Sequence, residues 1–284
     1  KSTVPEGFNL RGLRIAVDCA HGATYHVAPS VLSELGAEVI TMGVQPDGFN
    51  INEGVGSTDI GQLSQLVVER GADLGIAYDG DGDRVLFVDA AGELVDGDEL
   101  VYIIAMYRLA TGSSDAGVVG TLMSNLGLEV ALRDAGLELA RAQVGDRYVK
   151  ALMETNNWSL GGESSGHIIC NDVTTTGDGI VASLQVLMAL QAADGDLQAL
   201  RAGMKKYPQT MINVTVNRKV NLEDYPEVST AVAAVEQQLG ERGRVLLRPS
   251  GTEPKVRVMV EGESADEVEQ LCAGLAQEVE RVLA

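Results

Sequence analysis

Short runs of β-branched and aliphatic residues alternate with helical patterns through the first third of this chain. They predict strands at residues 14–17, 38–40 and 74–78, with helices near residues 28–35 and 59–70 between them. Gly36 and Gly71 follow the two helices, where a left-handed C-terminal cap favours glycine. This alternation is typical of βαβ units and predicts a mostly parallel sheet.

The remaining sequence predicts a second αβ series and then a change of pattern. The second series begins near Gly97 and ends with an apolar helix over residues 178–192. Strands predicted at residues 244–247 and 256–260 then follow one another without a helix between them, which favours a small α+β domain. The predicted fold class is α/β: two αβ domains with mixed, mostly parallel sheets, residues 1–94 and 95–205, and a small C-terminal α+β domain, residues 206–284.

Net charge and cysteine spacing narrow the classes of function. The 284 residues carry a formal net charge of -20, which repels nucleic acid and anionic membranes, so we expect neither as a partner. No apolar run approaches the ~18–20 residues needed to cross a bilayer. The three cysteines, Cys19, Cys170 and Cys272, are too far apart for a zinc motif and fit a reducing cytoplasm.

Three aspartates are concentrated in one short segment between two apolar runs. Residues 79–84 read Asp-Gly-Asp-Gly-Asp-Arg. Carboxylates this close repel one another, and a bound cation compensates that repulsion. The interleaved glycines allow the backbone to curve around an ion, and a small set of hard oxygen ligands suits Mg²⁺. Asp79, Asp81 and Asp83 are therefore the predicted metal ligands, with a solvated acidic turn as the alternative.

A second segment combines arginines with small hydroxyl-bearing residues. Residues 248–257 read Arg-Pro-Ser-Gly-Thr-Glu-Pro-Lys-Val-Arg and join two predicted strands. Backbone N–H groups and hydroxyls of such a loop can bind phosphate oxygens, and guanidinium groups bind phosphate in bidentate fashion. A plain hairpin turn is the alternative, but it does not explain an arginine at each end. The residues predicted to bind phosphate are Arg248, Ser250, Gly251, Thr252 and Arg257.

A third segment, residues 161–167, places a carboxylate, a hydroxyl and an imidazole in a glycine-rich sequence. Glu163 can accept hydrogen bonds from sugar hydroxyls or an ammonium group, Ser165 can donate and accept, and His167 can exchange a proton near neutral pH. The segment also matches the Gly-x-Ser-x-Gly elbow of serine hydrolases, with Ser164 as nucleophile. That fold needs a histidine well downstream of the serine, and no histidine follows His167.

In this order and spacing, the three segments resemble the α-D-phosphohexomutase family. Four further segments also resemble the sequences of this family: residues 120–125, 144–149, 174–179 and 258–262. The likeness covers essentially the whole chain. From the residues alone, 145–148 could equally be a helix start and 174–179 a turn with an N-cap. The resemblance implies a four-domain enzyme with a central cleft, of which this chain matches the second, third and fourth domains.

The resemblance also implies a role for each segment. By that likeness, the three aspartates of residues 79–84 hold Mg²⁺ against a phosphoserine, and Arg84 lies near the transferring phosphoryl group. Glu163 and Ser165 are similar to the family's sugar-hydroxyl contacts, and His167 is similar to a residue that lines the same site. Arg84 and His167 are thus the expected catalytic residues. The arginine-flanked segment looks like the clamp on the phosphate that does not react.

The implied reaction converts a phosphosugar, glucosamine 6-phosphate, to glucosamine 1-phosphate and back through glucosamine 1,6-bisphosphate, for amino-sugar and cell-wall precursors. The family's nucleophile is a phosphorylated serine in a Ser-His-Asn loop of the first domain, and no Ser-His-Asn occurs in this chain. We therefore expect that an N-terminal domain of the same polypeptide is missing and that the chain alone is inactive. The resemblance is compatible with a homodimer. A mutase acting on glucose or mannose phosphates and a non-catalytic phosphosugar-binding protein are the alternatives.

Overall fold

Two compact units make up the structure. A computed structural model describes residues 2–193, 195–217, 220–250 and 253–283. By their contacts, Lys1–Ser124 and Leu128–Met204 form unit 1, and Asn125–Gly127 and Lys205–Ala284 form unit 2. Within the described ranges, none of the helices combines the length and the apolar character that a membrane span requires.

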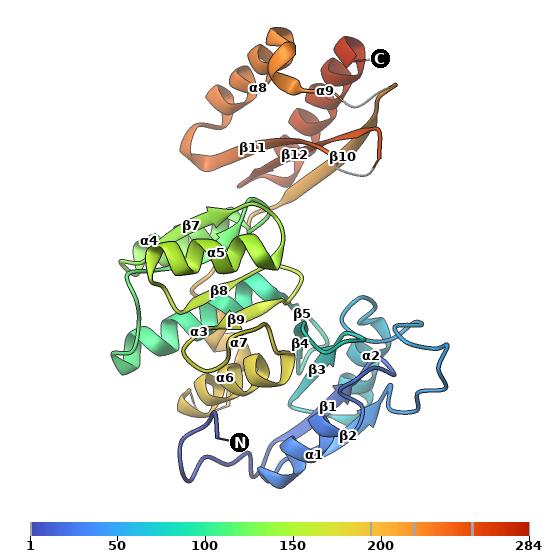
Figure 1. The fold of residues 1–284 in the computed structure, drawn as a ribbon, viewed down its shortest axis with the longest axis vertical. Coiled ribbons are helices and arrows are strands. Elements are labelled where there is room, and N and C mark those ends of the chain that lie inside the picture. Colours follow the sequence, from blue (N-terminus) through green and yellow to red (C-terminus); the bar gives the residue numbers. More distant parts are fainter. Residues whose placement is uncertain (1, 194, 218–219, 251–252, 284) are drawn as a thin grey trace. The chain divides into compact units, whose positions relative to one another are not determined.

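The first sheet of unit 1 has the strand order β2-β1-β3-β4-β5 (Figure 1). Its first three strands in sequence run parallel, joined by helices, and its last two run antiparallel to their neighbours. This confirms the predicted βαβ units and the mixed character of the sheet. The elements are β1 (Arg14–Asp18), α1 (Val27–Glu34), β2 (Glu38–Met42), α2 (Gly61–Arg70), β3 (Leu74–Tyr78), β4 (Val85–Asp89) and β5 (Leu94–Val95).

The second sheet of unit 1 has the order β7-β6-β8-β9, with β6 parallel to β7 and β8, and β9 antiparallel to β8. The sequence predicted only a loop where the hairpin of β8 and β9 forms, because three-residue strands are too short for a detectable alternation. The elements are α3 (Gly97–Thr111), β6 (Gly117–Thr121), α4 (Leu126–Asp134), β7 (Glu138–Ala142), α5 (Asp146–Asn156), β8 (Leu160–Gly162), β9 (Ile168–Cys170), α6 (Gly179–Ala192) and α7 (Leu197–Arg201).

One hydrophobic core runs through both sheets of unit 1. Phe87 on β4, Ile103 on α3 and Leu187 on α6 belong to the same cluster of buried side chains. Burial of each such side chain contributes about 1.5–3 kcal/mol. The Tyr78 ring is also buried here, and its hydroxyl lies 2.9 Å from Ser183 Oγ on α6. The end of β3 is therefore held in place against α6.

Unit 2 is a small α+β unit, as predicted from its consecutive strands. Its antiparallel sheet has the order β10-β12-β11. Glu261 on β12 is fully buried and accepts hydrogen bonds from Arg244 Nε at 2.6 Å and from Leu126 N at 3.0 Å. The elements are β10 (Gln209–Thr215), α8 (Pro226–Leu239), β11 (Gly243–Pro249), β12 (Lys255–Gly262) and α9 (Ala265–Leu283), with short 3₁₀ helices at Leu222–Asp224 and Gly240–Arg242.

Candidate functional site

The acidic segment forms the loop between β3 and β4, at the carboxyl end of a strand in a parallel set. In open α/β sheets this edge is where ligands bind. Two glycines make the loop possible. A Cβ atom on Gly80 would lie 2.6 Å from Ile51 Cδ1, and Gly82 has a φ of +78°, which favours glycine.

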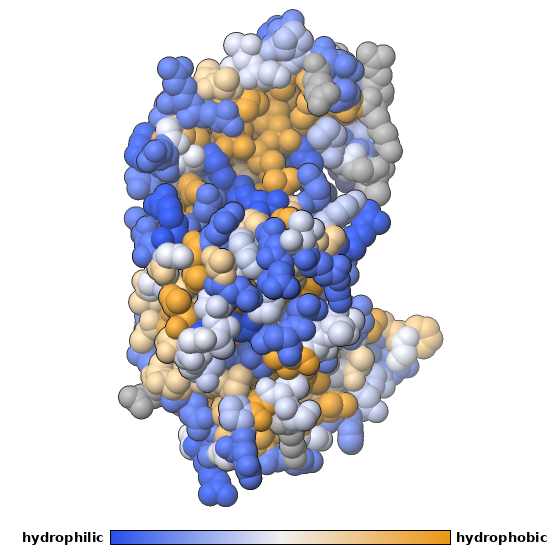
Figure 2. Space-filling model, turned by 60° about the vertical axis from the view of Figure 1, so that its left-hand side comes forward, coloured by the Kyte–Doolittle hydropathy of each residue, from blue (hydrophilic) through white to orange (hydrophobic). Residues whose placement is uncertain are grey.

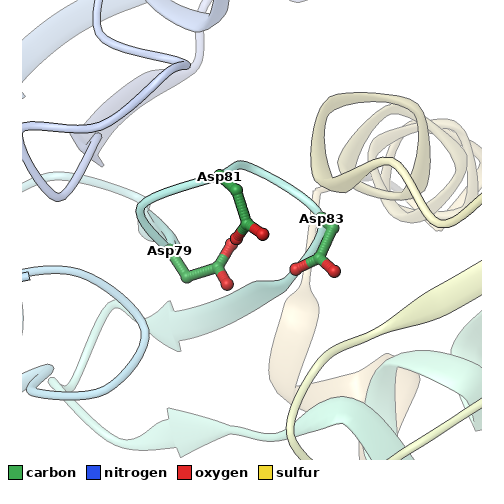
Figure 3. A group of neighbouring side chains, drawn as sticks. All are labelled: Asp79, Asp81 and Asp83. Atoms are coloured by element: carbon green, nitrogen blue, oxygen red, sulfur yellow. The ribbon is translucent and has the colours of Figure 1, made fainter. Parts of the chain in front are cut away.

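The three aspartates of this loop lie close enough together to share one cation. Figure 3 shows them along a single turn of the chain. One ligand oxygen from each of Asp79, Asp81 and Asp83 lies within 4.8 Å of the other two. Asp79 is buried, Asp83 is half-buried and Asp81 is exposed. The cluster is therefore covered by protein at Asp79 and accessible to solvent at Asp81.

Burial and a neighbouring charge act together on Asp79. Its Oδ1 atom accepts hydrogen bonds from Gly82 N at 3.1 Å and Arg84 N at 3.0 Å, which stabilise the carboxylate. Burial outweighs them and, with the nearby charge of Asp83, raises the pKa of Asp79 to about 6. A cation at this position would relieve both effects.

Asp83 provides the observation that best fits a metal ligand. Its Oδ1 atom is buried, and no hydrogen-bond partner for it is found among the described residues. The Arg84 Nε atom lies 3.8 Å from this oxygen and 3.8 Å from Asp79 Oδ2, beyond hydrogen-bond distance. A buried carboxylate oxygen without a donor is costly, and a divalent cation is the partner that this oxygen-rich set would accept. The residues present therefore fit Mg²⁺.

Backbone hydrogen bonds join the acidic loop to the glycine-rich segment of the β8–β9 hairpin. Val85 N donates to Gly166 O at 3.0 Å, and residues 84 and 167 form an isolated β-bridge. The His167 imidazole is buried, and its Nδ1 lies 3.1 Å from Asp83 Oδ2. The structure thus brings His167 to the aspartates, although the two segments are far apart in the sequence.

The segment before α6 closes around the same imidazole. A Cβ atom on Gly177 would lie 2.1 Å from His167 Nε2, so only glycine leaves room for the ring. Asp178 caps α6 by accepting hydrogen bonds from Ile180 N and Val181 N, and Gly179 N donates to Gly82 O at 2.9 Å. The segment that from its residues alone could have been only a turn and an N-cap also packs on the site.

The structure gives the two predicted sugar-contacting residues different surroundings. Glu163 is half-buried, and its Oε1 accepts a hydrogen bond from Gly145 N, just before α5, at 3.0 Å. Ser165 is exposed at the turn of the hairpin. Glu163 therefore holds the start of α5 with one oxygen, and Ser165 is available to a ligand from solvent.

Basic side chains missing from the predicted site line a cavity beside His167. The cavity has a volume of about 300 Å³, and Asp83, Arg147, Lys150 and Thr176 are among its lining residues. Lys150 Nζ donates a hydrogen bond to Thr175 O. The one available signal for these residues was the family likeness of residues 144–149. The helix start near residues 145–148 was also considered from the sequence, and it is α5 in the structure; that Arg147 and Lys150 line a cavity beside His167 became clear only in the structure.

The predicted phosphate-binding segment joins β11 and β12 in unit 2. Arg248 and Arg257 are directly opposite each other in the antiparallel pairing, and Ser250 is buried at the end of β11. Burial and the charge of Arg257 lower the pKa of Arg248. Like charges in this position are unfavourable. In the described part of the chain, neither arginine pairs with a carboxylate, and an anion would balance both. Gly251 and Thr252 lie outside the described residues.

Three family models together match nearly all of the chain. They are described as phosphoglucomutase/phosphomannomutase, alpha/beta/alpha domain II at residues 4–92, alpha/beta/alpha domain III at residues 96–207, and C-terminal domain at residues 211–278. The chain belongs to the phosphoglucomutase/phosphomannomutase family. Within it, the phosphoglucosamine mutase of Cellvibrio japonicus is 56% identical over 283 residues, and that of Teredinibacter turnerae is 58% identical over 281 residues. The chain spans 64% and 63% of the length of these relatives.

Solved structures of phosphoglucomutase/phosphomannomutase proteins and their relatives share the fold. A Burkholderia thailandensis family protein is 21% identical, with a TM-score of 0.78 over 97% of this chain and 62% of that chain. The Aspergillus fumigatus N-acetylphosphoglucosamine mutase, solved with GlcNAc-6P and magnesium, is 20% identical, with a TM-score of 0.77 over 100% of this chain and 64% of that chain. At these identities the likeness concerns the fold.

Proposed function

We propose that this chain is part of a phosphoglucosamine mutase that interconverts glucosamine 6-phosphate and glucosamine 1-phosphate. The observation that carries the proposal is the buried Asp83 oxygen without a donor, within a cluster of three aspartates beside Arg84 and His167. Relatives with this name, 56–58% identical over essentially the whole chain, support the choice of substrate.

In this proposal Asp79, Asp81 and Asp83 hold Mg²⁺. When bound, the ion neutralises charge on the phosphoryl group that is transferred. The Arg84 guanidinium donates hydrogen bonds to the same group from the open side of the loop. His167 directs Nδ1 toward Asp83 and thereby orients that carboxylate, while its ring lines the neighbouring cavity. The phosphoryl group passes from a phosphoserine outside this chain to the sugar, giving glucosamine 1,6-bisphosphate, and the sugar's other phosphoryl group returns to the serine.

The remaining predicted residues bind the sugar and its second phosphate. Glu163 and Ser165 accept and donate hydrogen bonds to the sugar's hydroxyl and amino groups. The loop from Arg248 to Arg257, with the Ser250 hydroxyl, binds the phosphate that is not being transferred.

Cation binding is the first test, because it needs no complete active site. Calorimetric titration of the chain with MgCl₂ should show one site that Asp81→Asn removes. Asp266→Asn changes an exposed aspartate on α9 and serves as the matched control, because it should leave binding unchanged. Equal Mg²⁺ binding by all three proteins would contradict the assignment of the ligands.

Catalysis is the second test. In a coupled assay for glucosamine 1-phosphate, the 284-residue chain alone should show no steady turnover. Joined to the segment that precedes the matching region in the Cellvibrio japonicus relative, it should become active. Steady activity of the chain alone would contradict the need for a phosphoserine from outside it.

The family description indicates one alternative activity, a mutase for other phosphosugars. Members are described as phosphoglucomutase/phosphomannomutase, so glucose and mannose phosphates are the competing substrates. Comparing kcat/KM of the joined protein for the glucosamine, glucose and mannose phosphates separates these activities.

We also propose that the protein resides in a reducing cytoplasm, since Cys19, Cys170 and Cys272 are all buried free thiols.

A further inference from the structure

Three loops meet at the edge of the first sheet and expose apolar side chains beside the acidic loop. The loop after β1 covers residues 19–26, the long loop after β2 covers residues 43–60, and the acidic loop covers residues 79–84. His21 N donates to Gly43 O, Asn52 N donates to Ala20 O, and Ala23 N donates to Gly80 O. The three loops are therefore one hydrogen-bonded assembly.

The apolar rim, as we call it, consists of the exposed apolar side chains of this assembly and of the adjoining start of α1: Tyr25, Val27, Phe49 and Ile51. Phe49 is 92% exposed, and Ile51, which packs against Gly80, is 53% exposed. The long loop extends away from the sheet in Figure 1, and hydrophobic side chains are visible on the surface of this unit in Figure 2. Exposed aromatic and aliphatic side chains on loops that are hydrogen-bonded to one another favour an interaction surface.

Phe49 is held outward by an ordered turn. Asp47 Oδ1 accepts hydrogen bonds from Phe49 N at 2.8 Å and Asn50 N at 3.0 Å, and Asn50 Nδ2 donates to Gln45 O at 3.0 Å. Further along, Gly56 N donates to the buried Asp18 carboxylate at 2.6 Å. These hydrogen bonds hold the backbone of the turn at Phe49 in place before any partner arrives, which lowers the entropy cost of docking.

We propose, on the basis of the function proposed above, that the apolar rim is the docking surface for the protein domain that carries the phosphoserine. A sugar ring can stack on one aromatic face, but a single phosphosugar is too small to cover the four exposed apolar side chains of the rim. The relatives extend well beyond the 63–64% of their length that this chain spans, and the models that match it are domains II, III and C-terminal. A domain that brings a phosphoserine to the aspartates must reach the acidic loop, and Ile51 borders that loop.

Hydrogen exchange tests the docking surface without any assay of catalysis. The probe is a chimera in which this chain replaces the matching region of the Cellvibrio japonicus relative. Amides of residues 45–52 should exchange at least about tenfold more slowly in the chimera than in the isolated chain, since docking removes local opening. Exchange around Val68, which is 56% exposed on α2, should be equal in both. The matching loop of the intact relative should be protected in the same way, which tests the surface without a chimera.

Matched substitutions separate docking from local stability. Phe49→Ser should lower the Tm of the chimera and restore fast amide exchange of its residues 45–52. The same substitution should leave the Tm of the isolated chain unchanged. Val68→Ser, at an exposed apolar residue away from the rim, should act equally on both proteins. Equal exchange of residues 45–52 in chimera and chain, or equal effects of Phe49→Ser on both, would overturn the proposal.

Sedimentation and activity measurements separate the docking surface from a self-association surface and from the proposed function. Sedimentation of the isolated chain as a dimer that Phe49→Ser dissociates would assign the rim to a second copy of the chain and overturn the proposal. Mutase activity of the chimera is measured separately. An active chimera with an unprotected loop would refute the docking surface alone, whereas a protected loop in an inactive chimera would support the surface and count against the proposed function.

Discussion

Asp79→Asn should stabilise the metal-free protein while abolishing its response to Mg²⁺. Burial and Asp83 raise the pKa of Asp79 from 3.8 to about 6. At about 1.4 kcal/mol per pKa unit, holding this carboxylate ionised at pH 7.5 costs the folded state at most about 3 kcal/mol. The substitution removes the charge and keeps an oxygen that can accept from Gly82 N and Arg84 N. The Tm in EDTA at pH 7.5 should therefore rise by up to about 6–12 °C.

The same raised pKa predicts how the stabilising effect of Asp79→Asn depends on pH. Between pH 3.8 and about 6 the folded protein binds more protons at Asp79 than the unfolded chain does. The contribution of this residue to the free energy of unfolding therefore falls as the pH rises through that window, and the full cost is present above it. The difference in stability between Asp79→Asn and the wild type should be large at pH 7.5 and should shrink toward pH 4.

Thermal unfolding in EDTA and in MgCl₂ measures both effects. With Mg²⁺ at 100 times its Kd, the wild type should gain about 2.7 kcal/mol and the variant nothing. Asp81→Asn is the control, because Asp81 is exposed and its loss should remove the Mg²⁺ response without stabilising the metal-free chain. A metal-free Asp79→Asn protein no more stable than the wild type at pH 7.5 would refute the reasoning.

Three further substitutions test other parts of the structure. Gly177→Ala should destabilise unit 1 by about 1–3 kcal/mol in thermal unfolding, because its methyl group would overlap the neighbouring imidazole, whereas Gly274→Ala in open space on α9 should be neutral or stabilising. Arg248→Gln should weaken calorimetric binding of inorganic phosphate by at least about tenfold, and Arg281→Gln on the exposed face of α9 should not; equal affinities would contradict the anion site. Glu261→Ala should cost about 3–5 kcal/mol in chemical denaturation, because it breaks a buried pair, and a loss below about 1 kcal/mol would show that this pair contributes little.

The order of strands and helices was readable from the sequence because its signals are local. Alternating apolar runs and helical patterns arise from neighbouring residues, and Gly71 does cap α2 in the left-handed conformation. The β8–β9 hairpin was missed for the same reason, since three-residue strands carry too little periodicity. The capping box of α3, formed by Asp96 and Glu99, was also missed and became clear from the hydrogen bonds themselves.

The candidate metal ligands could be predicted from the sequence because they lie close together in the chain. Asp79, Asp81 and Asp83 share one loop, so their repulsion by itself indicated a cation. The divisions at residues 94/95 and 205/206 stay predictions, and so does the assignment of each site residue to a role. The family and the fold class are confirmed by the family models and by the solved structures.

By itself the sequence determined the chemistry available here: clustered carboxylates for a cation, paired arginines for an anion, and the rhythm of an α/β fold. Only the tertiary structure decided which groups meet. It placed His167 against Asp83 and brought Arg147 and Lys150 to the same cavity. It also buried Asp79 deeply enough to raise its pKa, and it left Phe49 exposed on the long loop after β2. Contacts between distant segments, and the burial that perturbs a carboxylate, depend on how the whole chain packs, and no local pattern encodes them.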